Sequence, residues 1–192
     1  PFKVRMDSAM MEIVESVKHY GVLVPGLVRP KPDGGYEMVS GHRRKRASEM
    51  AGKPFPCIIR EMSDDEATII MVDSNLQREQ SLPSEKAFAY KMKLDAMRRQ
   101  QGERTDLTSA TVLQKLAKKT SREILAEQSG ESHEQIRRYI RLTNLIPEIL
   151  DMVDNTVLNE KGTLKMAMQP AVELSYLKEN EQQMLLETMV CE

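Results

Sequence analysis

The 192-residue sequence is poor in cysteine and in aromatic side chains, and it has no tryptophan. Its two cysteines, Cys57 and Cys191, form no CxxC pair and no cysteine–histidine cluster, so the sequence offers no disulfide framework and no zinc site. No apolar run approaches the roughly 18 residues that span a bilayer, and no signal-peptide pattern is present. We therefore expect a cytoplasmic protein without a membrane partner.

The near-neutral charge excludes a polybasic coat over the whole molecule. The formal net charge is −1, so any surface for nucleic acid must be local. Residues 98–141 carry 10 Lys and Arg against 6 Asp and Glu, whereas residues 142–192 carry 3 against 9. This asymmetry indicates a basic middle and an acidic end, although scattered, solvated charge would give a similar count.

The first 82 residues alternate helical and strand patterns. We expect a helix over 9–20, short strands within 22–30, 34–41 and 54–62, and a helix over 42–52. Ser63, followed three residues later by Glu66, is a capping box that begins a further helix. From Pro83 onward no strand pattern remains, and the expected helices cover 83–100, 109–118, 121–128, 133–143, 147–154 and 170–190. The predicted fold class is α+β, with a small mixed α/β domain at 1–82 and an all-helical domain at 83–192.

The stretch SREILAEQSGESHEQIRRYIRL, residues 121–142, has the pattern of a helix-turn-helix. Ala126 is small where two helices must cross, and Gly130 permits a left-handed turn between them. Ser132 can cap the second helix, whose Ile136 and Ile140 point to the core at i, i+4 spacing. An ordinary helical hairpin with a charged face would share part of this pattern.

The outward side of the second predicted helix suits double-stranded DNA, because Gln and Arg can bond base edges. The candidate DNA-binding residues there are Ser132, His133, Gln135, Arg137, Arg138 and Arg141. Base readout is assigned to Gln135, Arg137 and Arg138, with Arg141 nearer the DNA backbone. Phosphate contacts, which carry affinity rather than specificity, are expected from Arg98, Arg99, Lys118, Lys119 and Arg122.

Several segments of the chain resemble motifs of the ParB family of DNA-partition proteins, in the family's order. HYGVLVPGLVRP resembles the first ParB box, GGYEMVSGHRRKRA the arginine box, and NLQREQSL the third box. IPEILDMV and GTLKMAMQPAVELSYL resemble the helices that follow the family's helix-turn-helix. The resemblance runs over nearly the whole chain. It implies a ParB/sulfiredoxin-like amino-terminal domain, a DNA-binding helical domain, and a location at the bacterial nucleoid or a plasmid.

The ParB resemblance also implies that the amino-terminal domain binds a nucleotide, CTP or another NTP with Mg²⁺, which lets a DNA-loaded dimer close as a sliding clamp. The residues that match the family's nucleotide motifs are Gly41, His42, Arg43, Arg44, Arg46, Asn75 and Arg78. Gly41 leaves room for a phosphate, the helix after it presents unpaired N–H groups, and an arginine fork holds two oxygens. A helix cannot aim four consecutive residues one way. Some of these arginines must therefore face solvent or DNA phosphate, with Arg43 and Arg46 on one face.

Three positions depart from the family's motifs. His42 stands where the arginine box has Glu, Ser74 where the third box has Glu, and Val24 where the first box has Gln. Because Mg²⁺ prefers carboxylate oxygens, we expect nucleotide binding to be kept, altered in base preference or weakened, and hydrolysis to be slow or absent. Sulfiredoxin has its catalytic cysteine where this chain has Gly41, so a thiol-dependent reductase is not expected. Cys57, in an apolar strand, is predicted to lie in the core.

The leading hypothesis is a partition protein that recognises a specific DNA site and is gated by a nucleotide. An alternative is a nucleotide-dependent enzyme such as a kinase, NTPase or nuclease, for which Glu37, Glu49 and Asp73 are the nearby carboxylates, none in a convincing motif. A helix-turn-helix transcriptional regulator is the third hypothesis. We expect a homodimer in the full-length protein, since palindromic sites mirror two-fold proteins, and a ParA-like ATPase as partner through segments beyond this chain.

Overall fold

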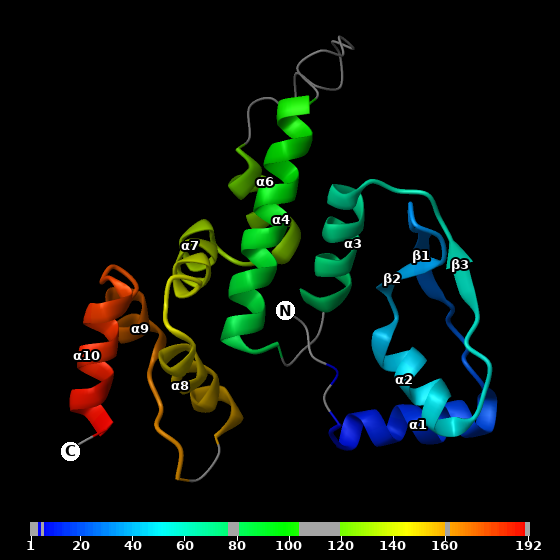
Figure 1. The fold of residues 1–192 in the computed structure, drawn as a ribbon, viewed down its shortest axis with the longest axis horizontal. Coiled ribbons are helices and arrows are strands. Elements are labelled where there is room, and N and C mark those ends of the chain that lie inside the picture. Colours follow the sequence, from blue (N-terminus) through cyan, green and yellow to red (C-terminus); the bar gives the residue numbers. More distant parts are fainter. Residues whose placement is uncertain (1–3, 5, 77–80, 104–119, 160–161, 191–192) are drawn as a thin grey trace. The chain divides into compact units, whose positions relative to one another are not determined.

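The computed structural model describes residues 4, 6–76, 81–103, 120–159 and 162–190. The chain divides into two compact units, Phe2–Asn75 and Leu76–Glu192, called the amino-terminal and carboxy-terminal units (Figure 1). The amino-terminal unit contains a three-stranded sheet with helices, whereas the described part of the carboxy-terminal unit has helices as its only regular elements. The α+β fold class predicted from the sequence is therefore confirmed.

The amino-terminal unit packs two helices against each other beside a small sheet. Its elements are α1 (Ser8–Tyr20), β1 (Gly26–Pro30), β2 (Tyr36–Ser40), α2 (His42–Ala51), β3 (Cys57–Ile59) and α3 (Asp64–Leu76). Met10, Val14 and Val17 lie on one face of α1 and are buried together with Ala47 of α2. The helical spacing of these apolar residues fixes which side of α1 meets α2.

The sheet has the strand order β2-β1-β3, so β1 is the central strand. β1 pairs antiparallel with β2, where Arg29 lies opposite Glu37, and parallel with β3. The strand expected within 22–30 begins only at Gly26. Pro25 comes directly before Gly26. Because proline has no backbone N–H to donate to a neighbouring strand, strand pairing begins only after it.

β3 is a short edge strand, and one sequence-based prediction fails there. The apolar pattern predicts Cys57 in the core, but its side chain is exposed, as are Ile58 and Ile59, each at 55%. An apolar strand pattern predicts burial only where neighbouring layers cover the strand. β3 pairs only with β1 and has exposed side chains throughout its length. The Cys57 Sγ lies 3.8 Å from the Phe55 carbonyl oxygen.

The carboxy-terminal unit is built from helices around one long helix. Its described elements are α4 (Pro83–Glu103), α6 (Ser121–Ser129), α7 (His133–Leu142), α8 (Pro147–Leu158), α9 (Met168–Leu174) and α10 (Glu179–Val190). The helix predicted over 109–118 lies outside the described residues. Leu142, Ile149 and Ala171, from α7, α8 and α9, are fully buried in one apolar cluster. Among the described residues, no helix combines the length and apolarity that crossing a bilayer requires.

The single helix predicted over 170–190 is wrong, because the chain forms α9 and α10 with a turn between them. Ser175 ends α9, and its hydroxyl donates to the Val172 carbonyl at 2.6 Å. The buried Gln182 side chain donates to the Leu177 and Asn144 carbonyls and accepts from the Ile146 N–H. A buried amide needs such partners, and here they are backbone groups of turns. The pattern of apolar residues did not reveal this interruption.

Candidate DNA interface and nucleotide site

Helices α6 and α7 are joined by a three-residue turn that the sequence specifies closely. Thr120 and Glu123 form a capping box at the start of α6, and Gly130 ends that helix with φ of 70°, in the left-handed region. The Ser132 hydroxyl accepts the Gln135 N–H at 3.1 Å and thereby caps α7. These local interactions fix where α7 begins and hence which of its side chains face outward.

The inner side of α7 is anchored to α4. Ile136 is 1% exposed and packs in a cluster with Leu125 of α6 and with Tyr90 and Leu94 of α4, and Ile140 lies partly buried against the same cluster. An apolar stripe at i, i+4 spacing therefore fixes the rotation of α7 about its own axis.

A half-buried ion pair joins α4 to the turn between α6 and α7. The Lys86 Nζ lies 2.8 Å from Glu131 and 5.2 Å from the centre of the Tyr139 ring, which in turn packs against Tyr90. Burial acts to lower the pKa of Lys86, but the interactions with Glu131, Tyr139 and Tyr90 together outweigh it, so the pKa is raised. Sequence reasoning missed this pair, since its partners are far apart in the chain and only Glu131 falls within the motif.

The outer side of α7 carries the predicted base-reading residues. His133 and Arg137 are exposed, and Gln135 and Arg138 are partly exposed. Arg137 and Arg138 approach Glu134 at 3.9 and 3.7 Å, in exposed i, i+3 and i, i+4 pairs. Pairs of this kind contribute about 0.3–0.5 kcal/mol, so both guanidinium groups can exchange Glu134 for another anion.

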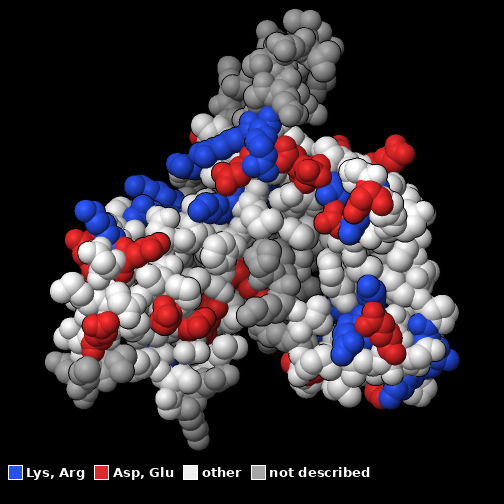
Figure 2. Space-filling model, in the orientation of Figure 1, with Lys and Arg blue, Asp and Glu red and all other residues white. Residues whose placement is uncertain are grey.

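Further basic side chains lie near α7 within the same unit. Arg98 and Arg99 of α4 and Arg122 of α6 are exposed. Figure 2 shows Lys and Arg side chains gathered on one side of the carboxy-terminal unit, over the region of α4, α6 and α7. Lys118 and Lys119, the other predicted phosphate contacts, lie outside the described residues.

Arg141, which is predicted to lie near the DNA backbone, bonds a residue at the end of α9. Its Nε donates to the Ser175 hydroxyl at 3.1 Å, and its Nη2 donates to the Ser175 carbonyl oxygen. The guanidinium also stacks 3.8 Å from the centre of the Tyr176 ring. These contacts tie the end of α7 to the segment after α9. Arg141 therefore has a structural role in the helical unit, and its contact with the DNA backbone stays a prediction.

The candidate nucleotide segment begins at a close approach of two glycines. Gly41 has φ of 109°, and a Cβ added there would lie 3.1 Å from the Gly26 Cα. A Cβ at Gly26 would lie 2.6 Å from the Phe55 ring. A side chain at Gly41 would therefore crowd the Gly26 backbone, and one at Gly26 would clash with Phe55. Gly41 precedes α2 and has no side chain that could cap it, and the N-terminus of a helix is suited to an anion.

Arg43 forms an ion pair across the two helices of the amino-terminal unit. Its Nη2 donates to the Asp7 Oδ1 at 2.9 Å, while its Nε is buried and has no hydrogen-bond partner among the described residues. The Met10 N–H, together with Arg43, holds the pKa of the Asp7 carboxyl below its usual range, against an opposing effect of burial. Sequence reasoning did not find this pair, since Asp7 belongs to none of the recognised motifs.

The other arginines of the segment have separate contacts. The Arg44 Nη1 donates to the carbonyl oxygens of Val24 and Pro25, at 2.6 and 3.1 Å, and so holds the chain just before β1. Arg46 turns to Glu49 of its own helix at 3.3 Å. Arg43 and Arg46, predicted to share a face, thus have different partners, and His42 is exposed at the first position of α2.

The third box is predicted to bring Asn75 and Arg78 to the phosphates. Asn75 is buried near the end of α3, and its Nδ2 donates to the Met71 carbonyl at 2.7 Å. Arg78 lies outside the described residues. The structure therefore places the Arg44 guanidinium beside Gly41, whereas Arg43 turns to Asp7 and the Asn75 amide to the backbone of its own helix.

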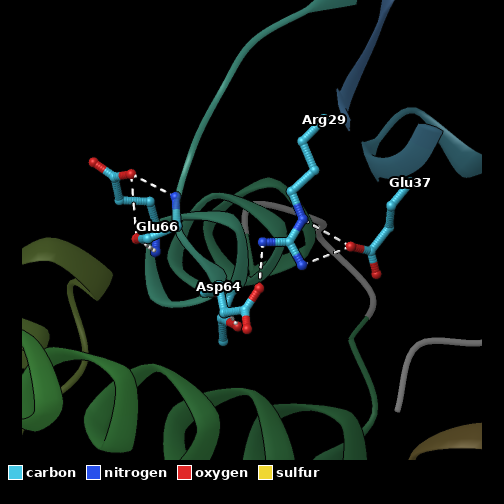
Figure 3. Close-up of polar contacts among 6 residues, drawn as sticks. Arg29, Glu37, Asp64 and Glu66 are labelled. Carbon is cyan, nitrogen blue, oxygen red and sulfur yellow. Dashed lines mark hydrogen bonds and ion pairs between the residues drawn. The ribbon is translucent and has the colours of Figure 1, made fainter. Parts of the chain in front are cut away.

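Two of the carboxylates considered for catalysis are held in ion pairs. Figure 3 shows Arg29 of β1 between Glu37 of β2 and Asp64 of α3, with the Arg29 Nε 2.7 Å from Glu37 and its Nη1 2.6 Å from Asp64. These carboxylates raise the pKa of Arg29. Glu49 contacts Arg46 and, at 3.9 Å, Lys45. A carboxylate bound to a guanidinium is poorly suited to act as a general base.

Comparison with known proteins identifies the family to which this chain is similar. Residues 1–76 match the family model of the ParB N-terminal domain. The chain is 32% identical over 155 residues to the chromosome-partitioning protein Spo0J of Thermus thermophilus, covering 80% of this chain and 49% of the relative. It is 35% identical over 161 residues to the stage 0 sporulation protein J of Bacillus subtilis, covering 83% of this chain and 47% of the relative.

A solved structure agrees with these relatives. The C-terminally truncated chromosome-partitioning protein ParB from Caulobacter crescentus, complexed to the centromeric parS site, matches with a TM-score of 0.53 and 25% identity. The match covers 91% of this chain and 76% of that chain. The chain therefore belongs to the ParB family. It spans about half the length of the curated relatives it matches.

Proposed function

We propose that the chain recognises a specific site on double-stranded DNA through α6 and α7, as part of a partition protein. The observation that carries this proposal is the two-sided character of α7. Ile136 and Ile140 anchor one side of the helix, while Arg137 and Arg138 project from the other with only loose contacts to Glu134. A helix fixed in rotation with arginines outward suits a major groove.

The proposed interface separates base readout from phosphate contact. Gln135, Arg137 and Arg138 read bases, and Ser132 and His133 lie at the start of α7, where a recognition helix contacts DNA. Arg98, Arg99 and Arg122, with Lys118 and Lys119, bind phosphates. The relatives' names support a role in partition, and the Caulobacter protein is complexed to parS. Homodimerisation of the full-length protein, a ParA-like partner and a place at the nucleoid or a plasmid belong to the same proposal.

The proposed DNA function is tested by selecting bound sequences from a random duplex library with the full-length protein. The selected site and a scrambled duplex are then compared by fluorescence anisotropy. Arg138→Ala is expected to weaken binding to the selected duplex by about 1–3 kcal/mol and to change the scrambled duplex much less. Arg122→Ala is the matched phosphate variant, expected to weaken both duplexes alike. Selection of no sequence would overturn the proposal.

We further propose that the amino-terminal unit binds CTP or another nucleoside triphosphate with Mg²⁺ at the start of α2. Three features fit a phosphate: the close approach of Gly41 to Gly26, the start of α2 at a glycine that has no capping side chain, and the buried Nε of Arg43, which has no partner among the described residues. His42 stands where the family has a carboxylate, so hydrolysis is expected to be slow or absent. The assignment of nucleotide binding to residues 1–82 and DNA binding to 83–192 is part of this proposal.

Calorimetric titration with each of the four NTPs, with and without Mg²⁺, tests the nucleotide site. We expect heat with at least one of them, and lost heat in Arg43→Ala. Absence of heat with all four would overturn this proposal and leave the DNA proposal standing, since α6 and α7 belong to the other unit.

A further inference from the structure

One oxygen atom of Asp7 serves two donors in different helices. Asp7 Oδ1 accepts the Met10 N–H at 2.8 Å, which caps α1, and the Nη2 of Arg43, in the first turn of α2, at 2.9 Å. The Asp7 carboxylate therefore binds the same Arg43 guanidinium that the proposed nucleotide site would use to bind a phosphate.

The ion pair of Asp7 and Arg43 has features that allow a ligand to replace Asp7 on the arginine. The Asp7 side chain is 42% exposed, so water screens its attraction to Arg43. The contact satisfies Nη2 alone, and the Arg43 Nε remains buried without a partner among the described residues. An oxyanion with several oxygens can accept from Nε and Nη2 together, which one oxygen of Asp7 does not do. A buried donor without an acceptor is unfavourable, which favours such a ligand.

We propose that Asp7 is an affinity-determining residue of the nucleotide site, because its carboxylate holds the place on Arg43 that a phosphate group of the ligand takes. The inference rests on the proposed nucleotide binding. When the ligand binds, the Arg43 guanidinium passes from the Asp7 carboxylate to the phosphate oxygens. Asp7 keeps its hydrogen bond from Met10, so α1 stays capped and only the ion pair is lost.

The simplest alternative is that the pair only fastens α1 to α2. The two roles predict opposite effects of removing the charge of Asp7. Asn at this position still caps a helix, so Asp7→Asn removes the competitor for Arg43 and leaves α1 capped. If Asp7 competes with the ligand, this variant binds nucleotide more tightly. If Asp7 only fastens the helices, the variant binds equally or less well.

The experiment is calorimetric titration of full-length wild type and Asp7→Asn with the NTP that gives the largest heat, at low salt. We expect Asp7→Asn to bind about two- to fivefold more tightly, the range for an exposed ion pair. Asp7→Ser, which also caps a helix, serves as a second variant if Asp7→Asn does not fold. Glu15→Gln is the charge-matched control, since Glu15 lies on α1 and pairs with Lys18. This control should bind as the wild type does.

A second readout follows the carboxyl group itself. Titration of Asp7 by NMR should show a pKa that is higher with saturating nucleotide than without it, because the ligand removes the cation that lowers it. A purely structural pair would leave this pKa unchanged.

The outcomes separate the two proposals. Binding by the wild type with equal or weaker binding by folded Asp7→Asn overturns the inference alone. Equal tightening in Glu15→Gln also overturns it, since the effect is then one of net charge. If neither wild type nor Asp7→Asn binds any NTP, the proposed nucleotide function fails and the inference fails with it.

Discussion

The ammonium group of Lys86 lies 2.8 Å from the Glu131 carboxylate and thereby fastens α4 to the turn that precedes α7. Lys86→Met should loosen that turn and lower the stability of the carboxy-terminal unit by about 1 kcal/mol, the upper end for a pair that is not fully buried. Urea denaturation measures the loss. Lys91→Met is the control, since Lys91 is exposed on the same helix and its ammonium group lies 3.3 Å from the uncharged Thr143 hydroxyl. Equal losses in both would contradict a role for the pair.

The same pair should influence DNA recognition through the position of α7. The exchanged double variant Lys86→Glu with Glu131→Lys restores opposite charges across the contact. We expect it to recover part of the binding to the selected duplex that each single variant loses. Binding that falls additively in the double variant would show that the two side chains act independently.

Ile136 should contribute far more to stability than its exposed neighbours. It is 1% exposed within the cluster that joins α4, α6 and α7. Ile136→Ala leaves a cavity and should lower the free energy of unfolding by about 2–5 kcal/mol. Val157→Ala, at a site that is 56% exposed in the same unit, should change it by less than about 0.5 kcal/mol. Similar values in the two variants would mean that the inner side of α7 is wrongly assigned.

Arg141 and Arg138 should separate in a DNA-binding assay although they share a helix. Arg141→Ala removes the bonds to Ser175 and the stacking on Tyr176, so a lower unfolding temperature is expected, with equal losses on selected and scrambled duplexes. Arg138→Ala should lower binding to the selected duplex much more than binding to the scrambled duplex. Equal losses on the two duplexes at an unchanged unfolding temperature would instead assign Arg141 to a DNA phosphate.

Stability should depend on pH through Asp154. This carboxylate of α8 is 7% exposed and accepts the Ser84 N–H at 2.9 Å, at the start of α4. Burial raises the pKa of Asp154 above its ordinary 3.8, against the hydrogen bonds from Ser84. The folded state therefore binds this proton more readily, and the resulting stability is present below the unfolded pKa and lost as pH rises through the folded pKa.

The variant Asp154→Asn isolates that contribution. Between about pH 3.5 and 7, chosen to span the ordinary value of about 4 and the range above it, the wild type should lose stability relative to Asp154→Asn as pH rises. Denaturation curves at a series of pH values measure the difference. A difference that is constant with pH would show that Asp154 does not titrate abnormally.

Gly41 should tolerate substitution less well than another glycine with positive φ. Gly41→Ala places a Cβ 3.1 Å from the Gly26 Cα, and should cost about 1–3 kcal/mol of stability and abolish nucleotide binding. Gly52, at the end of the same helix, has φ of 62° and open space where a Cβ would lie. Gly52→Ala should cost about 1 kcal/mol and leave nucleotide binding intact. Equal effects would contradict a close glycine contact.

Sequence patterns predicted local structure well wherever the cause was local. Gly130, Ser132 and the Ser63–Glu66 capping box act within a few residues of the chain, and each is found in the structure. The burial of Ile136 followed from helical spacing, since only one side of α7 is apolar. Each of these features is determined by residues that lie within a few positions along the sequence.

Predictions failed where the partner lay far along the chain. Cys57 has the apolar neighbours of a core strand, but its place at the sheet edge depends on which strands pair. The contacts of Arg141 with Ser175 and Tyr176 were likewise not predicted, since these residues come from a later helix end. Asp7 and Arg43 are 36 positions apart. The motifs predicted which residues form the candidate site, but they did not predict the contacts of those side chains.

The position of Arg29 in the central strand has a consequence for how the amino-terminal unit assembles. Arg29 faces Glu37 in the β1–β2 register and also reaches Asp64 at the first turn of α3. A slip of one residue between β1 and β2 would turn the guanidinium to the opposite face of the sheet and leave Asp64 without it. Correct alignment of the hairpin and docking of α3 are thus expected to form as one cooperative step during folding.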